Sequence, residues 1–187
     1  MADQYLTQNQ FEDLFYQFTV AAINMSPAAD VRISWPTEGA PAFDIDDDVA
    51  YLQCSEVDDN YNISKEMRYT GVASPDSLTE SFYYVRVMEV HWVFYGPNAY
   101  DRASTVRESL YRDSDREILS DSNVYPIPSD ASPRRLPENF QGRWWTRYDL
   151  VCRFNEQIKK EKEVGFVQSV DVVIEQENGQ QTEITIE

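Results

Sequence analysis

Regular alternation from Arg143 to Phe154 constrains the fold of this chain more than any other sequence feature. One set of alternate positions is almost entirely apolar or aromatic: Trp144, Thr146, Tyr148, Leu150, Cys152 and Phe154. The other set is mostly charged: Arg143, Trp145, Arg147, Asp149, Val151 and Arg153. Successive side chains of a β-strand point to opposite faces of its sheet, so this pattern predicts a long strand with one buried and one polar face.

The residues that follow predict a partner for this strand. The charged segment Lys159–Glu163 is expected to form a turn, and apolar residues then recur on one side of a second strand: Val164, Phe166, Val170, Val172 and Ile174. Two such strands around a polar tip predict a long antiparallel hairpin. Asn178-Gly179 is typical of a tight turn and predicts a last short strand over Thr182–Ile186.

The N-terminal half predicts helices and further strands. Apolar residues recur at helical spacing over Gln8–Met25 and again over Asn98–Arg112. The run Glu80–Tyr95 carries apolar residues at both alternating sets of positions, which is typical of a central strand covered on both sides. Shorter apolar runs predict strands at Val31–Trp35 and Val49–Cys54.

This order of elements predicts an α+β fold, because strands follow strands and do not alternate with helices. We expect a mixed, mainly antiparallel sheet with a long C-terminal β-hairpin, packed against an N-terminal helix and a central helix. The length of 187 residues suits a single domain. Polar segments that contain Pro and Gly predict extended loops at about 37–48, 56–79 and 120–142.

The composition restricts the functions of the chain. It has 33 acidic and 16 basic residues, a net charge of −17, and one histidine. Such a surface repels DNA, because DNA binding depends on cationic contacts. A single histidine offers little to histidine catalysis or multi-histidine metal sites, and Cys54 and Cys152 form no CxxC pair. Nucleotide-binding and hydrolase motifs do not occur in the sequence. We therefore expect no enzyme, no cofactor and no metal site.

Membrane association is not expected either. No apolar run in the sequence approaches the ~18 residues of a membrane helix. The first residues lack the basic and apolar regions of a secretory signal. Two cysteines without a disulfide framework suit a reducing cytosol.

The densest acidic cluster lies at Asp44, Asp46, Asp47 and Asp48. A calcium loop of the EF-hand type needs glycine at its sixth position and glutamate at its twelfth. Counted from Asp44, these positions hold Val49 and Ser55, so the match fails. The cluster and the pair Asp58-Asp59 are interpreted as solvated acidic loops.

Two groups of basic residues are candidates for protein contacts. Adjacent strand residues point to opposite faces, so Trp144 is expected in the core and Trp145 outside, beside three arginines: Arg143, Arg147 and Arg153. This face is either a subunit interface or an amphipathic edge that the proline-rich loop covers. The expected hairpin tip at Lys159, Lys160 and Lys162 either increases solubility or contacts an acidic neighbour.

Several of these features together resemble the neck or tail terminator (tail-completion) proteins of long-tailed bacteriophages. They are an N-terminal amphipathic helix, a strand that ends in Trp35-Pro36, and a long strand that leads through Gly96 into a helix. The most specific piece is a W-x-R-x-D-L run followed by F-N-E: Trp145, Arg147, Asp149, Leu150, Phe154, Asn155 and Glu156. The resemblance covers roughly Phe11 to Ile174.

The resemblance implies a structural virion protein that assembles in the host cytoplasm. Such proteins form a ring, usually a hexamer, that caps the completed tail tube, ends its polymerisation and joins the tail to the head connector. The implied partners are other copies of the chain, the tail tube protein, the head connector or completion protein and, as an open alternative, the sheath. DNA would pass through without specific binding, and the acidic cluster Asp44–Asp48 is expected to face the lumen or the surrounding solvent.

A second interpretation is an acidic, β-rich binding module, for example for carbohydrate. Trp145 or Trp35 would then serve as an exposed platform on which a sugar ring stacks. The amphipathic helices and the long charged hairpin fit this interpretation less well than they fit a subunit of a ring.

Overall fold

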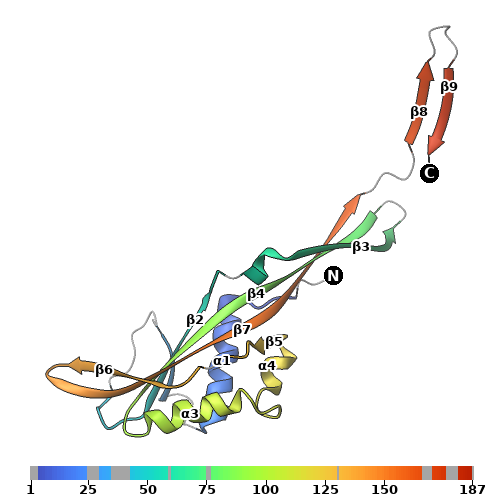
Figure 1. The fold of residues 1–187 in the computed structure, drawn as a ribbon. Coiled ribbons are helices and arrows are strands. Elements are labelled where there is room, and N and C mark those ends of the chain that lie inside the picture. Colours follow the sequence, from blue (N-terminus) through green and yellow to red (C-terminus); the bar gives the residue numbers. More distant parts are fainter. Residues whose placement is uncertain are drawn as a thin grey trace. The chain divides into compact units, whose positions relative to one another are not determined.

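A computed structural model describes residues 4–24, 30–34, 43–58, 60–74, 77–129, 131–165, 170–175 and 181–186 (Figure 1). Trp35, Asp59 and Phe166 lie outside the described residues. Contacts divide the chain into two compact units. The larger unit comprises Tyr5–Ser64 and Tyr84–Ile158; the smaller unit comprises Met1–Gln4, Lys65–Tyr83 and Lys159–Glu187. That all of these residues fold as a single domain stays a prediction.

The fold class is α+β, as predicted. The helices are α1 (Gln8–Ile23), α3 (Ala99–Ser109), α4 (Glu117–Asp121) and a 3-10 turn at Asn60–Ile63. The strands are β1 (Val31–Ile33), β2 (Val49–Glu56), β3 (Lys65–Ser74), β4 (Ser77–Tyr95), β5 (Val124–Pro126), β6 (Arg134–Phe140), β7 (Arg143–Gly165), β8 (Val170–Glu175) and β9 (Gln181–Ile186).

The main sheet has the strand order β1-β2-β4-β7-β5 (Figure 1), with β3 paired to β4 and β6 paired to β7. β1 runs parallel to β2, whereas β2 is antiparallel to β4. β5 and β6 are both antiparallel to β7. The sheet is therefore mixed and mainly antiparallel, and β4 and β7 are its long central strands.

Helix α1 forms where the apolar periodicity predicts it. Thr7 caps its N-terminus, because its hydroxyl accepts a hydrogen bond from the Gln10 backbone while the Gln10 side chain bonds back to Thr7. Asn24 ends the helix in the left-handed conformation, which asparagine tolerates better than most residues. The buried side of the helix consists of Phe11, Leu14, Phe15, Phe18 and Thr19.

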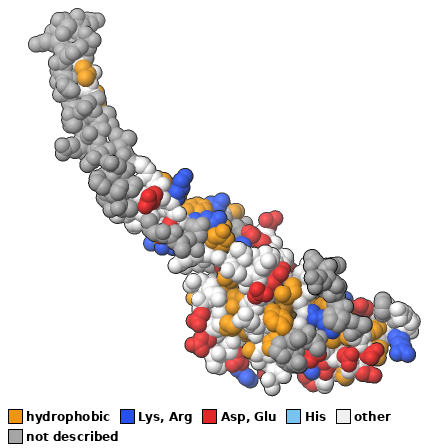
Figure 2. Space-filling view, turned by 180° about the vertical axis from the view of Figure 1, so that it is seen from behind, with side chains coloured by type: hydrophobic (Ala, Val, Ile, Leu, Met, Phe, Trp, Pro, Cys, Tyr) orange, Lys and Arg blue, Asp and Glu red, His pale blue; other side chains and the backbone are white. Residues whose placement is uncertain are grey.

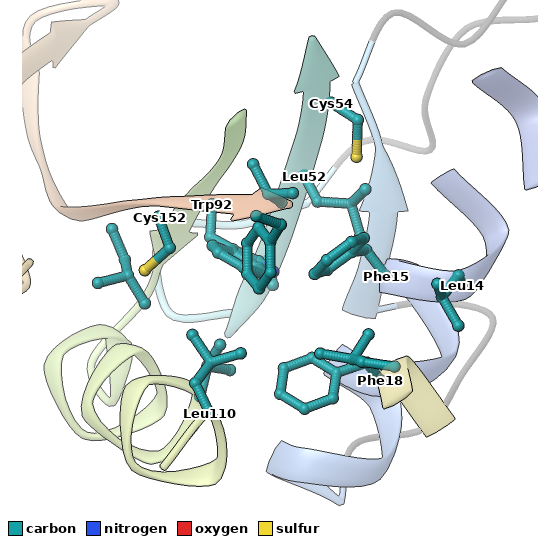
Figure 3. Packing of buried hydrophobic residues seen from close by; sticks show 14 of the residues in the cluster. Leu14, Phe15, Phe18, Leu52, Cys54, Trp92, Leu110 and Cys152 are labelled. Atoms are coloured by element: carbon teal, nitrogen blue, oxygen red, sulfur yellow. The ribbon is translucent and has the colours of Figure 1, made fainter. Parts of the chain in front are cut away.

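The hydrophobic core lies between this side of α1, helix α3 and one face of β4 and β7 (Figure 3). The Phe15 ring lies 4.5 Å from Phe154 of β7 and 5.9 Å from Trp92 of β4, between ring centroids. The indole nitrogen of Trp92 donates a 2.9 Å hydrogen bond to the Thr19 hydroxyl, so its polar atom is satisfied inside the core.

The apolar alternation of β4 and β7 is confirmed on this face. Met88, Val90, Trp92 and Phe94 of β4 are fully buried, as are Leu150, Phe154 and Ile158 of β7. The other face of β4 is less enclosed, since Val85 and Val93 are half-buried there and only Val87 is fully buried. Both faces of β4 are therefore covered, although the face toward α1 is covered more completely.

The predicted turn at Lys159–Glu163 does not exist. β7 continues through these residues to Gly165, and β8 pairs with β9 instead of β7. The segment from Ile158 to Val164 contains no Gly, Pro, Asn or Asp, the residues that tight turns require. The C-terminal hairpin of this fold is therefore the short β8–β9 pair.

Two of the predicted loops also contain strands. The segment 56–79 holds β3 and the first residues of β4, and the segment 120–142 holds β5 and β6. The prolines of the second segment led to the loop prediction: Pro126 is the last residue of β5, and Pro137 lies in β6, whose one partner among the described strands is β7. Strands at the edge of a sheet tolerate a missing N–H. In the loop predicted at 37–48, residues 43–48 form no helix or strand.

Phe15→Ala should destabilise the protein by about 3–5 kcal/mol, because it opens a cavity between α1 and the two central strands. Equilibrium unfolding in urea measures the change. Gln17→Ala, on the exposed side of the same helix, is the matched control and should lie within about 0.5 kcal/mol of the parent. A loss below about 1 kcal/mol for Phe15→Ala would contradict this description of the core.

Candidate functional site

The polar face of β7 carries a network of charged groups that joins three strands. Arg147 donates hydrogen bonds of 2.7 and 2.8 Å to the two carboxylate oxygens of Asp149. It donates a third, of 2.9 Å, to Glu138 of β6. His91 Nε2 of β4 lies 2.8 Å from Asp149, and the Tyr95 hydroxyl donates a 2.9 Å bond to Glu138. We call these five residues the Arg147 network.

The network shifts the pKa values of Asp149, Arg147 and Tyr95. Burial alone would raise the pKa of Asp149, but hydrogen bonds from His91 and Arg147 outweigh burial and hold this pKa below its ordinary value. The same hydrogen bond to Asp149 raises the pKa of Arg147. Burial, followed by the bond to Glu138, raises the pKa of Tyr95. Asp149 is only 7% exposed, so Arg147 supplies the counter-charge that its carboxylate needs.

The predicted orientation of the two tryptophans is reversed. Trp144 is 70% exposed, whereas the half-buried Trp145 contacts Phe43 and Tyr95 with ring centroids 5.3 and 6.3 Å apart. Phe43 lies far from Trp145 in the sequence, in a segment predicted to be a loop, so the aromatic cluster on this face was not visible in the strand pattern. The arginine and tryptophan face is therefore largely occupied by contacts within the chain.

The four predicted interface residues thus fall into three situations. Arg147 and Trp145 have partners within the chain, as just described. Arg153 is half-exposed and forms a 3.1 Å ion pair with Glu89. Arg143 is exposed and has no ion-pair partner among the described residues. Their role in a subunit interface stays a prediction, for which Arg143 is the best placed of the four.

Sequence reasoning missed a neighbouring surface on β6. Arg134 and Arg135 are exposed and, within the part of the chain that the structure describes, have no ion-pair partner. Leu136 beside them is 39% exposed. We call Arg134, Arg135, Leu136, Arg143 and Trp144 the β6–β7 edge. Two adjacent arginines in a chain of net charge −17 were a usable signal, but the loop predicted at 120–142 concealed it.

The lysines of the expected tip lie within β7, in the smaller unit. The Lys159 ammonium forms a 2.7 Å ion pair with Glu161 and lies 5.8 Å from the ring centroid of Tyr83. Lys160 and Lys162 are exposed on the alternate positions. Contact of these lysines with a partner stays a prediction, although they do not project from a turn.

The acidic cluster divides into two parts. Asp44, Asp46 and Asp47 are exposed, and the Asp47 carboxylate accepts a 2.8 Å bond from the Asp44 backbone. Asp48 is half-buried and accepts hydrogen bonds from Asn98 at the start of α3 and from Arg102. Burial works to raise the pKa of Asp48, and the bonds from Asn98 and Arg102 reverse this effect and lower it.

Asp48 therefore fastens the acidic loop to the N-terminus of α3, where a negative charge also complements the helix dipole. Gly96 allows the acidic loop to approach α3 closely: its φ is +102°, and a Cβ atom there would lie 2.5 Å from the Asp47 carbonyl oxygen.

Among the described residues, no group of three or more His, Cys, Asp or Glu side chains is arranged to hold a metal ion.

A buried ion pair joins the two central strands. Glu156 of β7 is 1% exposed and bonds to the Arg86 guanidinium of β4, with 3.0 Å to Arg86 Nε. The Leu6 backbone N–H donates a 2.7 Å bond to Glu156, and its carbonyl accepts a 2.9 Å bond from Arg86. This pair therefore ties the segment before α1 to β4 and β7.

Both cysteines are buried and free. Burial raises the pKa of Cys54 to about 12 and the pKa of Cys152 to about 11. At neutral pH both are therefore thiols and not the reactive thiolates.

None of the helices in the described residues has the length and apolar character needed to span a bilayer.

The residues of the W-x-R-x-D-L and F-N-E runs now have observed positions. They supply the Arg147 network, the core residues Leu150 and Phe154, and the buried carboxylate Glu156. A family model described as phage neck terminator protein matches residues 9–180. The chain belongs to this family. Comparison with curated proteins finds no match.

The neck terminator family is a structural one, so the chain is a structural protein of the phage neck and a virion component. Membership also implies association with other head or tail proteins. The residues of the two runs contribute ion pairs and core packing within the chain.

Asp149→Asn should make the neck terminator less stable at neutral pH by about 1–3 kcal/mol, because Arg147 and His91 lose a charged partner. A lowered folded pKa means that the contribution of Asp149 is present above its unfolded pKa, ordinarily 3.8, and is lost as the pH falls through the folded value. The difference from the parent should therefore shrink below about pH 4. Denaturant unfolding across a pH series measures it.

Asp46→Asn removes an exposed carboxylate of the same kind and serves as the control, with a difference close to zero at every pH. A deficit for Asp149→Asn that stayed constant from neutral to acid pH would show that the Asp149 charge contributes nothing.

Glu156→Leu should cost about 3–5 kcal/mol, because it removes the buried carboxylate and leaves the Arg86 charge only the 3.8 Å ion pair with the more exposed Glu56. The double variant Arg86→Met/Glu156→Leu should recover much of this loss, since an apolar pair of similar volume has no charge to desolvate. A double-mutant cycle by chemical denaturation gives the coupling. If the single variant loses less than about 1 kcal/mol, the pair is not buried as described.

Proposed function

We propose that this protein forms a ring, a hexamer, in the neck of the virion. The ring caps the completed tail tube, ends its polymerisation and joins the tail to the head connector. Its partners are further copies of the chain, the tail tube protein, the sheath where the tail has one, and the head connector or completion protein. Assembly takes place in the host cytoplasm. The observation that carries the proposal is the family match over residues 9–180.

The charge distribution supports passage of DNA through such a ring. The chain has 17 more acidic than basic residues, so a large negative charge remains even if every basic residue is paired. Asp44, Asp46 and Asp47 are exposed and are our candidates for the lumen. Asp48 is the weakest candidate of the cluster, because it caps α3. Acidic groups repel phosphates over about 8 Å at physiological salt, so only residues near the channel would act on passing DNA.

We also propose that the protein has no catalytic role, because its family is structural. The structure supports the carbohydrate-binding alternative less well than the sequence did. Trp145, its main platform, is half-buried against Phe43 and Tyr95, which leaves little of its ring face for a sugar. Trp35 lies outside the described residues.

Phage that cannot make this protein should accumulate tails that are not joined to heads, with tubes of irregular length. Supplying the protein in trans should restore joined, uniform tails. Electron microscopy of lysates provides both readouts, and averaging of restored virions should place a sixfold ring between tube and connector. Variants of exposed residues, such as Gln17→Ala, serve as complementation controls.

Uniform tails joined to heads in the absence of the protein would refute the proposed function. In the averaged ring, placement of the Asp44–Asp47 loop on the outer rim would remove the lumen assignment while leaving the capping role intact.

A further inference from the structure

The smaller unit contains a sheet whose charge differs from that of the rest of the chain. It consists of β3, the first part of β4 and the last part of β7, the segments 65–83 and 159–165, which we call the lysine sheet. These segments hold five acidic and five basic residues, among them all four lysines of the chain. The larger unit holds 22 acidic and 11 basic residues, a net charge of −11. The negative charge is therefore concentrated outside the lysine sheet.

One face of the lysine sheet has its charges paired internally. The Arg68 guanidinium and the Lys159 ammonium lie over the ring of Tyr83, 5.5 and 5.8 Å from its centroid. Arg68 forms a 2.6 Å ion pair with Glu66. Lys159 forms one of 2.7 Å with Glu161. Successive strand residues point to opposite faces, so these contacts determine which residues of the three strands share this face.

The opposite face combines large apolar side chains with lysines. The Tyr69 hydroxyl donates a 3.1 Å hydrogen bond to Glu80, so these two residues lie on the same side of the sheet. Met67 and Tyr69 are 59% and 56% exposed. Alternation along the three strands places seven residues here, which we call the Met67 face: Lys65, Met67, Tyr69, Glu80, Phe82, Lys160 and Lys162.

The Met67 face is basic, with three lysines and one glutamate. Its lysines are exposed, and Lys65 and Lys162 have no ion-pair partner among the described residues. Figure 2 shows hydrophobic side chains next to Lys and Arg side chains in the described part of the smaller unit. Methionine and aromatic residues are enriched in protein–protein interfaces. A surface that fits this face is therefore acidic and provides apolar contacts.

We propose that the Met67 face docks onto the acidic larger unit of a neighbouring copy of this chain. Charge complementarity selects this occupant, because the face carries a net charge of +2 and the larger unit one of −11. Duplex DNA is acidic as well, but its phosphate backbone provides no apolar contact for Met67 and Tyr69. A protein surface provides both.

This contact also suits a ring of acidic subunits. Copies that each carry a charge of −17 repel one another, and a basic face turned toward the next subunit reverses this repulsion locally. The contact joins two different surfaces, so it is heterologous and generates a closed ring when its rotation closes. The inference rests on the proposed ring and names a surface through which its subunits touch.

A photocrosslinker tests the contact in assembled particles. Tyr69 is replaced by p-benzoylphenylalanine in one tagged copy, and phage that lack the protein are complemented with this copy and with a parent copy that carries a different tag. After irradiation of the virions, we expect a crosslinked dimer with both tags, joined at a peptide of the larger unit. Thr70, exposed on the other face of the same strand, is the matched control position and should give little of this product.

Every other result of the irradiation overturns the proposal. A dimer joined at the smaller unit of the second copy would show that two lysine sheets pair with each other. A crosslink within one chain, with none between copies, would show docking in cis. Crosslinks to a tail protein, a connector protein or DNA alone would identify a different occupant. Equal yields from positions 69 and 70 would show that the contact does not involve the Met67 face.

Substitutions on the two faces of β3 provide an independent measurement. Met67→Asp should raise the dissociation constant of self-association about tenfold or more, because it removes an apolar contact and places a negative charge against an acidic partner. Thr70→Asp adds the same charge on the other face and should have a much smaller effect. Lys65→Glu and Arg68→Glu form a second matched pair of exposed positions, in which Lys65→Glu should weaken association more.

Sedimentation velocity measures these constants, and circular dichroism confirms that each variant is folded. Equal weakening by the two members of either pair would refute the proposed contact. The crosslink in virions decides the question where the purified protein stays monomeric. If averaged virions contain a ring in which the Met67 face meets no other copy, this inference fails and the proposed function stands. If they contain no ring, the proposed function itself fails.

Discussion

The contact of Phe15 with Trp92 and Phe154 is the interaction on which the rest of the structure depends. These rings come from α1, β4 and β7, and they close the apolar face that the two central strands share. Removing large aromatic surfaces from water is the strongest stabilising term available to a chain with so much charge. Once α1 covers this face, the two long strands are held beside each other. Charged side chains of β4 can then reach their partners on β7.

Two ionic arrangements then hold the central strands in register. Arg86 and Glu156 are buried together with the backbone of Leu6, while the Arg147 network lies farther along the same pair of strands. Breaking such pairs leaves a buried charge without a partner, so each penalises a slipped register. The charged residues of the W-x-R-x-D-L and F-N-E runs, Arg147, Asp149 and Glu156, thus act within the chain.

This internal use of charge has a consequence for assembly. Arg147, Arg86, Arg102 and Arg153 are committed to carboxylates of their own chain. Arg134, Arg135 and Arg143 are exposed and have no ion-pair partner in the part of the chain that the structure describes. In the ring proposed above, such cations would have the greatest effect where two negative surfaces meet.

Local pattern in the sequence determined the α+β class, helix α1 and the buried faces of β4 and β7, because period-two and helical spacing reflect which residues meet the core. The same pattern misplaced Trp144 and Trp145, since Phe43, which packs against Trp145, comes from a distant loop. It also predicted a turn at Lys159–Glu163, because charge was taken as the end of a strand although no turn-forming residue was present. Only the tertiary structure decided which charges are paired. Partners such as Arg86 and Glu156 lie 70 positions apart, and their meeting depends on strand order and register, which local sequence does not encode.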